Sequence, residues 1–243
     1  MHVTSIRTPR VEAGDSLFAL LDSCVPPLAE RDVVVITSKI VSLAENRIVP
    51  KDSITKYDLI RREADLFLEV EKNPHDFYLT VKDGILVLCA GIDESNVKDV
   101  YVLYPEDVQK TAASIWTFLR EKHGIQELGI LITDTRVTML RRGVTGFALG
   151  WCGFEPLYSY IGQADLYGRP LCVTQINIPD ALATAAVFTM GEGNEQTPLA
   201  LIREAPKMSF VDHPPTPEEV KSVHISMQED VYGPLLRTAA WTC

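Results

Sequence analysis

The chain has 243 residues, of which 46% are hydrophobic and 23% are charged, and its formal net charge is -10. This length is sufficient for one large domain or for two intimate subdomains. The apolar content excludes an intrinsically disordered chain, and the modest numbers of glycine and proline exclude a collagen-like one. The chain has 33 acidic and 23 basic residues, and this acidic balance argues against a nucleic-acid partner, which would require a basic surface.

The N-terminal segment lacks the apolar core of a signal peptide, and no apolar run approaches the roughly 18 residues of a membrane-spanning helix. The five cysteines are odd in number and form no Cys-x-x-Cys pair, which argues against a disulfide framework or a zinc site. Cys89 and Cys172 have apolar neighbours, so we expect both to be buried. These features predict a cytoplasmic protein with reduced thiols and no membrane partner.

The apolar pattern predicts secondary structure along most of the chain. It indicates, in order, a strand over 32–37, a surface helix over 55–71, a strand over 84–90, a helix over 105–122 and a strand over 128–133. It then indicates strands over 144–150, 171–178 and 199–203 and an Ala-rich helix over 180–190. Because these elements follow no regular βαβ rhythm, we predict an α+β fold, with mixed sheets and flanking helices in two intimate subdomains.

The pattern weakens beyond Glu204, where several prolines interrupt it. Thr216 to Glu219 has the form of a capping box that begins a helix, so this tail is expected to be partly helical. We therefore divide the chain into a main domain over 1–204 and a C-terminal extension over 205–243.

Three acids lie where an apolar element ends in a small or polar loop: Asp93, Asp134 and Glu192. Loops at the ends of rigid strands are frequent sites of function. Carboxylates beside a Thr oxygen, here Thr135, suit Mg²⁺ or Mn²⁺ rather than Zn²⁺. Each acid alone also has a structural interpretation, because Asp93 and Asp134 could cap turns and Glu192 could be an exposed acid in a glycine loop.

Candidate phosphate-binding groups accompany these acids. Ser38 and Lys39 follow a buried strand, and the glycine loop 191–194 could bring backbone N–H groups to an anion. Arg141 and Arg142 could present bidentate forks to phosphate or carboxylate, or could belong to a solvated turn. The chain contains no Walker A motif.

These motifs, in this order, resemble the family of γ-glutamyl ligases that add glutamate to the deazaflavin coenzyme F420 precursor. The resemblance extends from about Val3 to Arg203. It rests on the strings Ser38-Lys-Ile-Val-Ser42, Ala90-Gly-Ile-Asp-Glu-Ser-Asn-Val97, Ile132-Thr-Asp-Thr135, Arg141-Arg-Gly143, Asp165-Leu-Tyr-Gly-Arg169 and Met190-Gly-Glu-Gly193.

The resemblance implies a GTP- or ATP-dependent ligase with two divalent cations, Mg²⁺ or Mn²⁺, that acts as a homodimer. An acyl phosphate of the acceptor would react with the amine of L-glutamate, and Arg141 and Arg142 would steady the transferred group. Asp93, Asp134, Thr135 and Glu192 would hold the metals. The nucleotide would contact Thr8, Pro9, Arg10, Val11, Ser38, Lys39, Asn96, Gly191, Gly193 and Asn194.

Two departures from the family pattern lie near these motifs. Leu43 stands where the family has a lysine, and Val137-Thr138 replaces a Gly-Arg pair found in many members. They suggest that the acceptor pocket has diverged, which favours a folate-type acceptor over the deazaflavin precursor, although both end in a carboxylate that would serve. Two alternatives stay open, a metal-dependent phosphohydrolase and a non-catalytic nucleotide-binding dimer.

Overall fold

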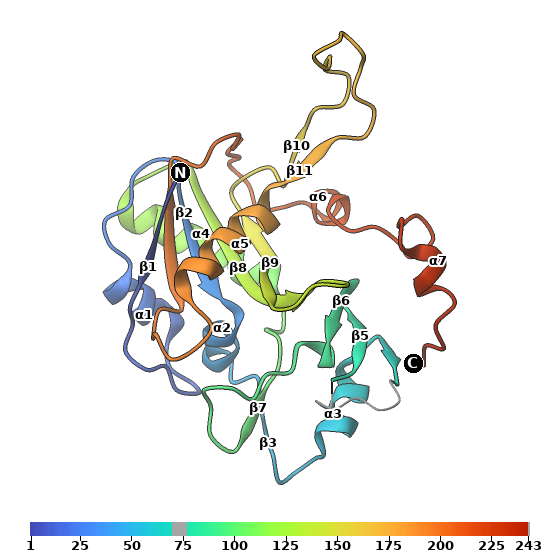
Figure 1. The fold of residues 1–243 in the computed structure, drawn as a ribbon. Coiled ribbons are helices and arrows are strands. Elements are labelled where there is room, and N and C mark those ends of the chain that lie inside the picture. The colour runs from blue at the N-terminus through green and yellow to red at the C-terminus, as the bar shows by residue number, and fades with distance from the viewer. Residues whose placement is uncertain (70–76, 243) are drawn as a thin grey trace.

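The run Val33–Ile36 is completely buried, so both faces of its strand need a covering layer. The computed structural model describes residues 1–69 and 77–242 and places this strand, β2 (Asp32–Thr37), at the centre of a five-stranded sheet (Figure 1). The order is β1 (His2–Ile6), β12 (Leu199–Arg203), β2, β8 (Leu128–Val137) and β9 (Val144–Cys152). Only β2 and β8 run parallel within this sheet, and its other pairs are antiparallel.

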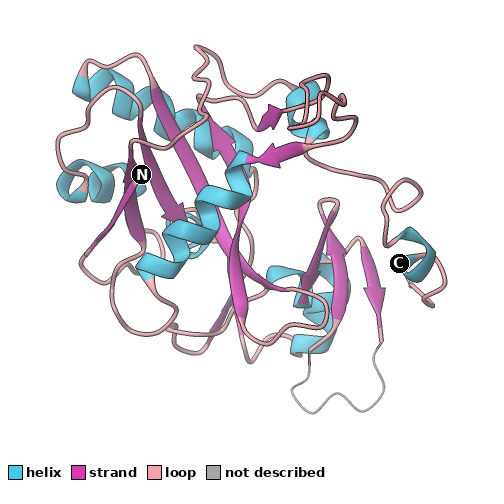
Figure 2. Ribbon diagram, turned by 45° about the horizontal axis from the view of Figure 1, so that its top comes forward, coloured by secondary structure: helices cyan, strands magenta, loops and turns pink. Residues whose placement is uncertain are grey.

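Helices cover both faces of this sheet (Figure 2). On one face, α1 (Leu17–Cys24), α2 (Ser38–Ala44) and α4 (Val108–His123) pack on Val34 and Ile36. On the other face, α5 (Ile178–Met190) packs on Val33 and Val35. The alternation of side chains along β2 therefore divides the core into two apolar clusters.

A smaller sheet has its own apolar cluster. It contains β4 (Leu66–Leu68), β5 (Leu79–Lys82) and β6 (Ile85–Leu88), and α3 (Lys56–Glu63) contributes Leu59 and Ile60 to the cluster. The three-residue turn η1 (Cys89–Gly91) leads from β6 toward β7 (Val100–Val102), which pairs with β3 (Ile48–Pro50). The fold is thus α+β with mixed sheets and flanking helices, as predicted.

Two further segments extend from this body. The hairpin of β10 (Leu157–Ser159) and β11 (Gln175–Asn177) carries a projecting arm over 160–174 (Figure 1). The tail forms α6 (Pro217–Ser222) and α7 (Gly233–Leu236) and then returns to the small sheet, where Thr242 exchanges two backbone hydrogen bonds of 2.8 Å with Phe67. The predicted capping box of Thr216 and Glu219 is confirmed.

Several predicted elements differ from those observed. The helix predicted over 55–71 ends at Glu63, because Phe67 is buried in β4; residues 70 and 71 of that prediction lie outside the described residues. The strand predicted over 84–90 ends at Leu88, and that over 171–178 is reduced to β11. The helix predicted from residue 105 begins at Val108, because the Asp107 side chain accepts a hydrogen bond from the Lys110 N–H.

The cysteine predictions had mixed outcomes. Cys89 is buried as expected, but the prediction for Cys172 is wrong, since its apolar neighbours lie in the exposed arm. No helix among the described residues is long and apolar enough to cross a membrane.

Candidate active site

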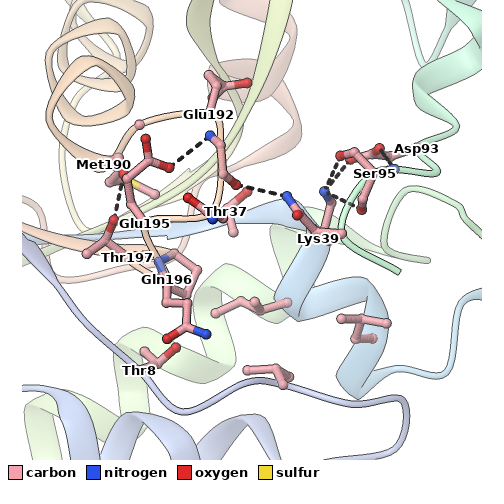
Figure 3. A pocket seen from close by; sticks show the side chains of 18 of the residues that line it. Thr8, Thr37, Lys39, Asp93, Ser95, Met190, Glu192, Glu195, Gln196 and Thr197 are labelled. Atoms are coloured by element: carbon pink, nitrogen blue, oxygen red, sulfur yellow. Dashed lines mark hydrogen bonds and ion pairs between the residues drawn. The ribbon is translucent and has the colours of Figure 1, made fainter. Parts of the chain in front are cut away.

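A cavity of about 660 Å³ lies at the carboxyl ends of β2 and β8. Because these two strands are parallel, they deliver Thr37 and Thr133 to the same edge of the sheet, paired in register. Ligands bind preferentially at such an edge. The other walls come from the segment 8–11, the loop 93–98 and the loop 190–198 (Figure 3).

The structure brings most of the predicted site residues to this one cavity. Those that line it are Thr8, Pro9, Arg10, Val11, Lys39, Asp93, Asn96, Asp134, Thr135, Gly191, Glu192, Gly193 and Asn194. Leu43, which stands in place of the family lysine, is also in the wall.

Three predicted residues lie elsewhere. Ser38 is buried as the first residue of α2. Arg141 and Arg142 are exposed in the turn between β8 and β9. The apolar run of β8 ends at Ile132, but the strand continues to Val137, and this extension carries the two arginines beyond the cavity wall.

Asp93 is held by an ion pair with Lys39. The Lys39 Nζ lies 2.6 Å from Asp93 Oδ2 and also donates to the backbone oxygen and the hydroxyl of Ser95, at 3.0 and 2.8 Å (Figure 3). Burial opposes ionisation of Asp93, but the charge and hydrogen bond of Lys39 outweigh it and lower the pKa of the carboxyl group. Asp93 is therefore ionised and already partnered.

Asp134 lies in a contrasting environment. Burial raises its pKa to about 6, against the opposing effects of the Tyr104 hydroxyl and the Thr135 backbone, and the charges of Asp93 and Glu192 add to the increase. The buried Tyr104 hydroxyl interacts with Asp134 electrostatically but forms no hydrogen bond of regular geometry with any described residue. Asp134 is thus a carboxyl group without a cationic partner in the part of the chain that the structure describes.

Tyr104 is held in place by an unusual turn. Cys89, Ala90 and Gly91 in η1 all have positive φ, at 54°, 52° and 72°. A Cβ atom on Gly91 would overlap the Tyr104 ring. The turn therefore requires glycine at position 91 for its backbone conformation and for the close approach of the phenol.

The loop after α5 supplies the third acid. Glu192 Oε2 accepts a hydrogen bond of 3.3 Å from Thr135 Oγ1. Burial raises the pKa of Glu192, opposed by Thr135 and Lys39, while Asp93 and Glu195 raise it further. Asn96 Nδ2 donates to the Gly193 oxygen at 2.9 Å and so connects this loop to the loop that bears Asp93.

Glu195 folds back over the glycines of the same loop. Its Oε2 accepts a hydrogen bond of 2.8 Å from the Gly193 N–H, and a Cβ atom on Gly191 would lie 2.6 Å from its Cδ atom (Figure 3). The carboxylate of Glu195 therefore lies where an anion bound by this loop would be expected.

The donor chemistry of the site fits a hard divalent cation. Three carboxylates and the Thr135 hydroxyl face one cavity, and the buried Thr133 hydroxyl beside them has no partner among the described residues. Within those residues, no three His, Cys, Asp or Glu side chains are close enough together to hold a metal ion. Asp93 is engaged by Lys39 and Glu192 by Thr135, so ligation requires both to leave these partners.

Sequence reasoning missed several residues of the site. Thr133 and Ser95 lie within strings that the sequence analysis singled out, and strand-end position could have identified both. Tyr104 and Glu195 could not be found in this way, because Tyr104 resembles a core aromatic residue and the fold-back of Glu195 depends on loop geometry.

Comparison with known proteins assigns the chain to a class. The family model described as F420-0:Gamma-glutamyl ligase matches residues 5–204, so the chain belongs to this family of ligases.

Individual relatives agree with this assignment. A coenzyme F420:L-glutamate ligase of Methanopyrus kandleri is 35% identical over 80% of this chain and 82% of the relative. The protein of the same name from Methanothermobacter thermautotrophicus is 35% identical over 82% of this chain and 86% of the relative. One from Halorubrum lacusprofundi is 33% identical over 84% and 86% of the two chains.

Proposed function

We propose that this protein is a nucleotide- and metal-dependent γ-glutamyl ligase. It joins the carboxylate of a deazaflavin or folate-type acceptor to the amine of L-glutamate through an acyl phosphate. One observation carries the proposal: Asp93, Asp134 and Glu192, from three separate loops and strands, line the same cavity beside Lys39 and a glycine loop. The names of the relatives support the ligase reaction.

The chemistry requires activation of a carboxylate, because hydroxide is a poor leaving group. Transfer of the γ-phosphoryl group to the acceptor carboxylate forms the acyl phosphate and releases the nucleoside diphosphate. The glutamate amine then attacks the acyl carbon and the amide bond forms. Inorganic phosphate leaves with the electron pair of the broken C–O bond, and the proton lost by the amine passes to the phosphate or to water. No covalent bond to the protein is needed, so catalysis consists of positioning and electrostatic stabilisation.

Different residues of the cavity are proposed to bind the phosphates and the metal ions. Lys39 and the backbone N–H groups of the loop 191–194 are placed to bind phosphate oxygens, and Thr8 to Val11 form the opposite wall. Asp93, Asp134, Thr135 and Glu192 would hold Mg²⁺ or Mn²⁺. When bound, such ions neutralise the negative charge of the phosphates.

The proposal includes a homodimer. The arm over 160–174 exposes Ile161, Leu166, Tyr167 and Val173, and the last three are at least 83% exposed. Contiguous exposed apolar side chains are typical of association surfaces. Sedimentation velocity tests this part: Leu166→Glu should yield monomers, and a wild-type chain that sediments as a monomer would contradict it.

Turnover tests the reaction itself. The full chain is incubated with Mn²⁺ or Mg²⁺, GTP or ATP, L-glutamate and either acceptor, and products are measured by mass spectrometry. A product heavier by one glutamate residue is expected, and no such product with either acceptor would overturn the proposal. Phosphate release that is independent of glutamate would instead indicate a phosphohydrolase.

Adjacent acids provide a matched pair of variants. Asp93→Asn should abolish turnover. Glu94→Gln should retain it, because Glu94 pairs with Lys51 and Lys56 at 2.9 and 2.6 Å and does not line the cavity.

A further inference from the structure

A second cavity, of about 350 Å³, lies between the main sheet, the small sheet and the C-terminal tail. We propose that it binds the ring end of the acceptor, a flat heteroaromatic ring with carbonyl groups on one edge. This inference rests on the proposed ligase function, and it assigns a site outside the cavity described above. Binding pockets are common where separate units of a fold meet.

The position of this cavity suits an acceptor whose carboxylate reaches the first site. Arg136 lines the second cavity and follows Asp134 by two residues in β8. Residues two apart in a strand share a face and are separated by about 7 Å. A ring held beside Arg136 could therefore direct the side chain that carries its carboxylate toward Asp134.

Apolar groups form the broad walls. Phe147 and Trp151 are buried in β9 on the sheet side, and Ile85 and Leu86 of β6 also line the cavity. The Arg136 guanidinium lies over the Phe147 ring, with its carbon 4.9 Å from the ring centroid. Aromatic and aliphatic walls of this kind suit a planar ring.

Two of the polar residues that line the cavity, Arg136 and Asn177, carry hydrogen-bond donors, whereas Asp180 and Asp230 are acidic. Arg136 donates to Asp180 Oδ2 at 2.9 Å, and Asp180 Oδ1 accepts from the Ala148 N–H at 2.9 Å. The guanidinium is thus fixed, yet 35% of the side chain is exposed, and the side chain forms no other hydrogen bond among the described residues. Its remaining N–H groups are therefore available to acceptors on a ligand, which would replace water there.

Asn177 adds a donor on the same side. Its Oδ1 accepts from the Asp180 N–H at 3.0 Å as the cap of α5, and Asn177 also lines the cavity, so its amide NH₂ remains available as a donor. Donors from Arg136 and Asn177 match carbonyl oxygens on the edge of a ring. Because Asp180 already neutralises the charge of Arg136, this ion pair does not favour a ring that carries a negative charge.

The tail forms the outer wall, with Ile225 and Met227 among its lining residues. His224 lies over the β5–β6 turn, where a Cβ atom on Gly84 would be 3.5 Å from its Nδ1. The pairing of Thr242 with Phe67 fixes the far end of the tail. Because the family match ends at residue 204, this wall lies outside the matched region, and we infer that it adapts the cavity to this chain's own acceptor.

Ring binding is tested directly with the full chain, without nucleotide or metal. Riboflavin and pteroate serve as flavin-type and pterin-type probes in fluorescence titrations. We expect one of them to bind, and at least a tenfold loss of affinity in Arg136→Lys, which keeps the charge but lacks the planar fork. Ile225→Trp, which fills the cavity, should cause a similar loss, whereas Val231→Trp should not, since Val231 is an exposed tail residue outside the cavity.

Turnover separates this proposal from the ligase proposal. Ile225→Trp should raise the KM for the acceptor at least tenfold and leave the KM for the nucleotide unchanged. An unchanged acceptor KM in an active enzyme, or the failure of both probes to bind, would overturn the ring site while ligase activity stands. Probe binding that depends on Arg136 and Ile225, in a protein that forms no glutamate adduct, would support the ring site and reject the ligase reaction.

Discussion

Lys39 Nζ lies 2.6 Å from Asp93 Oδ2, so one of the carboxylates proposed to bind metal is already paired with an ammonium group. The two side chains are 21% and 39% exposed. Such a partly exposed pair contributes on the order of 1 kcal/mol. Any cation that binds Asp93 must therefore compete with Lys39, which is also proposed to bind phosphate.

We predict opposite effects of Lys39→Met on the two ligands. Affinity for Mn²⁺ alone should increase about fivefold, because the ion-pair energy no longer opposes binding. Affinity for the nucleotide should decrease, since a phosphate contact is lost. Electron paramagnetic resonance titration of free Mn²⁺ and calorimetry with GTP measure the two quantities. Lys51→Met is the control, and Mn²⁺ affinity equal to that of the wild type would contradict the competition.

Glu195 gives a second prediction about anion binding. Its carboxylate accepts the Gly193 N–H at 2.8 Å and places a negative charge in the loop proposed to hold phosphate. Glu195→Gln should increase nucleotide affinity by about tenfold, which corresponds to the loss of one competing charged hydrogen bond. Calorimetry at low salt measures the change. A weaker affinity in the variant would mean that Glu195 assists the nucleotide rather than excluding it.

The acids of the site were predictable, but their partners were not. Asp134 follows an apolar run that is recognisable in the sequence, and Asp93 and Glu192 leave apolar elements into small or polar loops. The contact of Tyr104 with Asp134 depends on how the segment after β7 packs against β8, and a buried tyrosine beside a short strand carries no sign of this role. The position of Arg141 outside the cavity wall follows from the continuation of β8 beyond its apolar run, which the sequence pattern did not indicate.

The large sheet was likewise more predictable than the small one. β2 and β8 are buried on both faces and therefore appear as continuous apolar runs. β3, β4 and β7 have three residues each, which is too short for an alternating pattern to emerge. The helix predicted over 55–71 includes the residues of β4. Those residues form a strand instead, because pairing with β5 and burial of Phe67 override the local helical preference.

Tyr104→Phe tests the support of Asp134 by the phenol. The variant removes a hydroxyl that favours the charged carboxylate, so the pKa of Asp134 should increase further and Mn²⁺ affinity should decrease about tenfold. Tyr101→Phe is the control, because Tyr101 is a neighbouring buried tyrosine that does not line the cavity. Equal Mn²⁺ affinities for Tyr104→Phe and the wild type would show that the phenol only packs.

Asp134→Asn should stabilise the metal-free protein while abolishing turnover. The folded-state pKa of about 6 exceeds the ordinary value of 3.8, so the folded protein retains a proton that the unfolded chain releases between these values. Stability is thus lost as the pH rises from about 4 to 6, and this loss persists at higher pH, at roughly 1.4 kcal/mol per pKa unit. Thermal unfolding in EDTA should show a higher Tm for the variant at pH 8 and equal values at pH 4. A lower Tm at pH 8 would contradict this account.

Gly91→Ala tests the turn that supports Tyr104. The substitution requires alanine at a φ of 72° and also places a Cβ atom in the space of the Tyr104 ring. The left-handed conformation costs about 1–2 kcal/mol and overpacking adds about 1–3 kcal/mol. Gly124→Ala is the matched control, because Gly124 has a similar φ of 65° with no atom within 4 Å of the added Cβ. Urea unfolding should therefore show a clearly larger loss for Gly91→Ala, and turnover should fall only in that variant as Tyr104 is displaced from Asp134. Equal losses of stability would mean that the Tyr104 ring moves aside with no loss of folding free energy and that the turn does not fix its position.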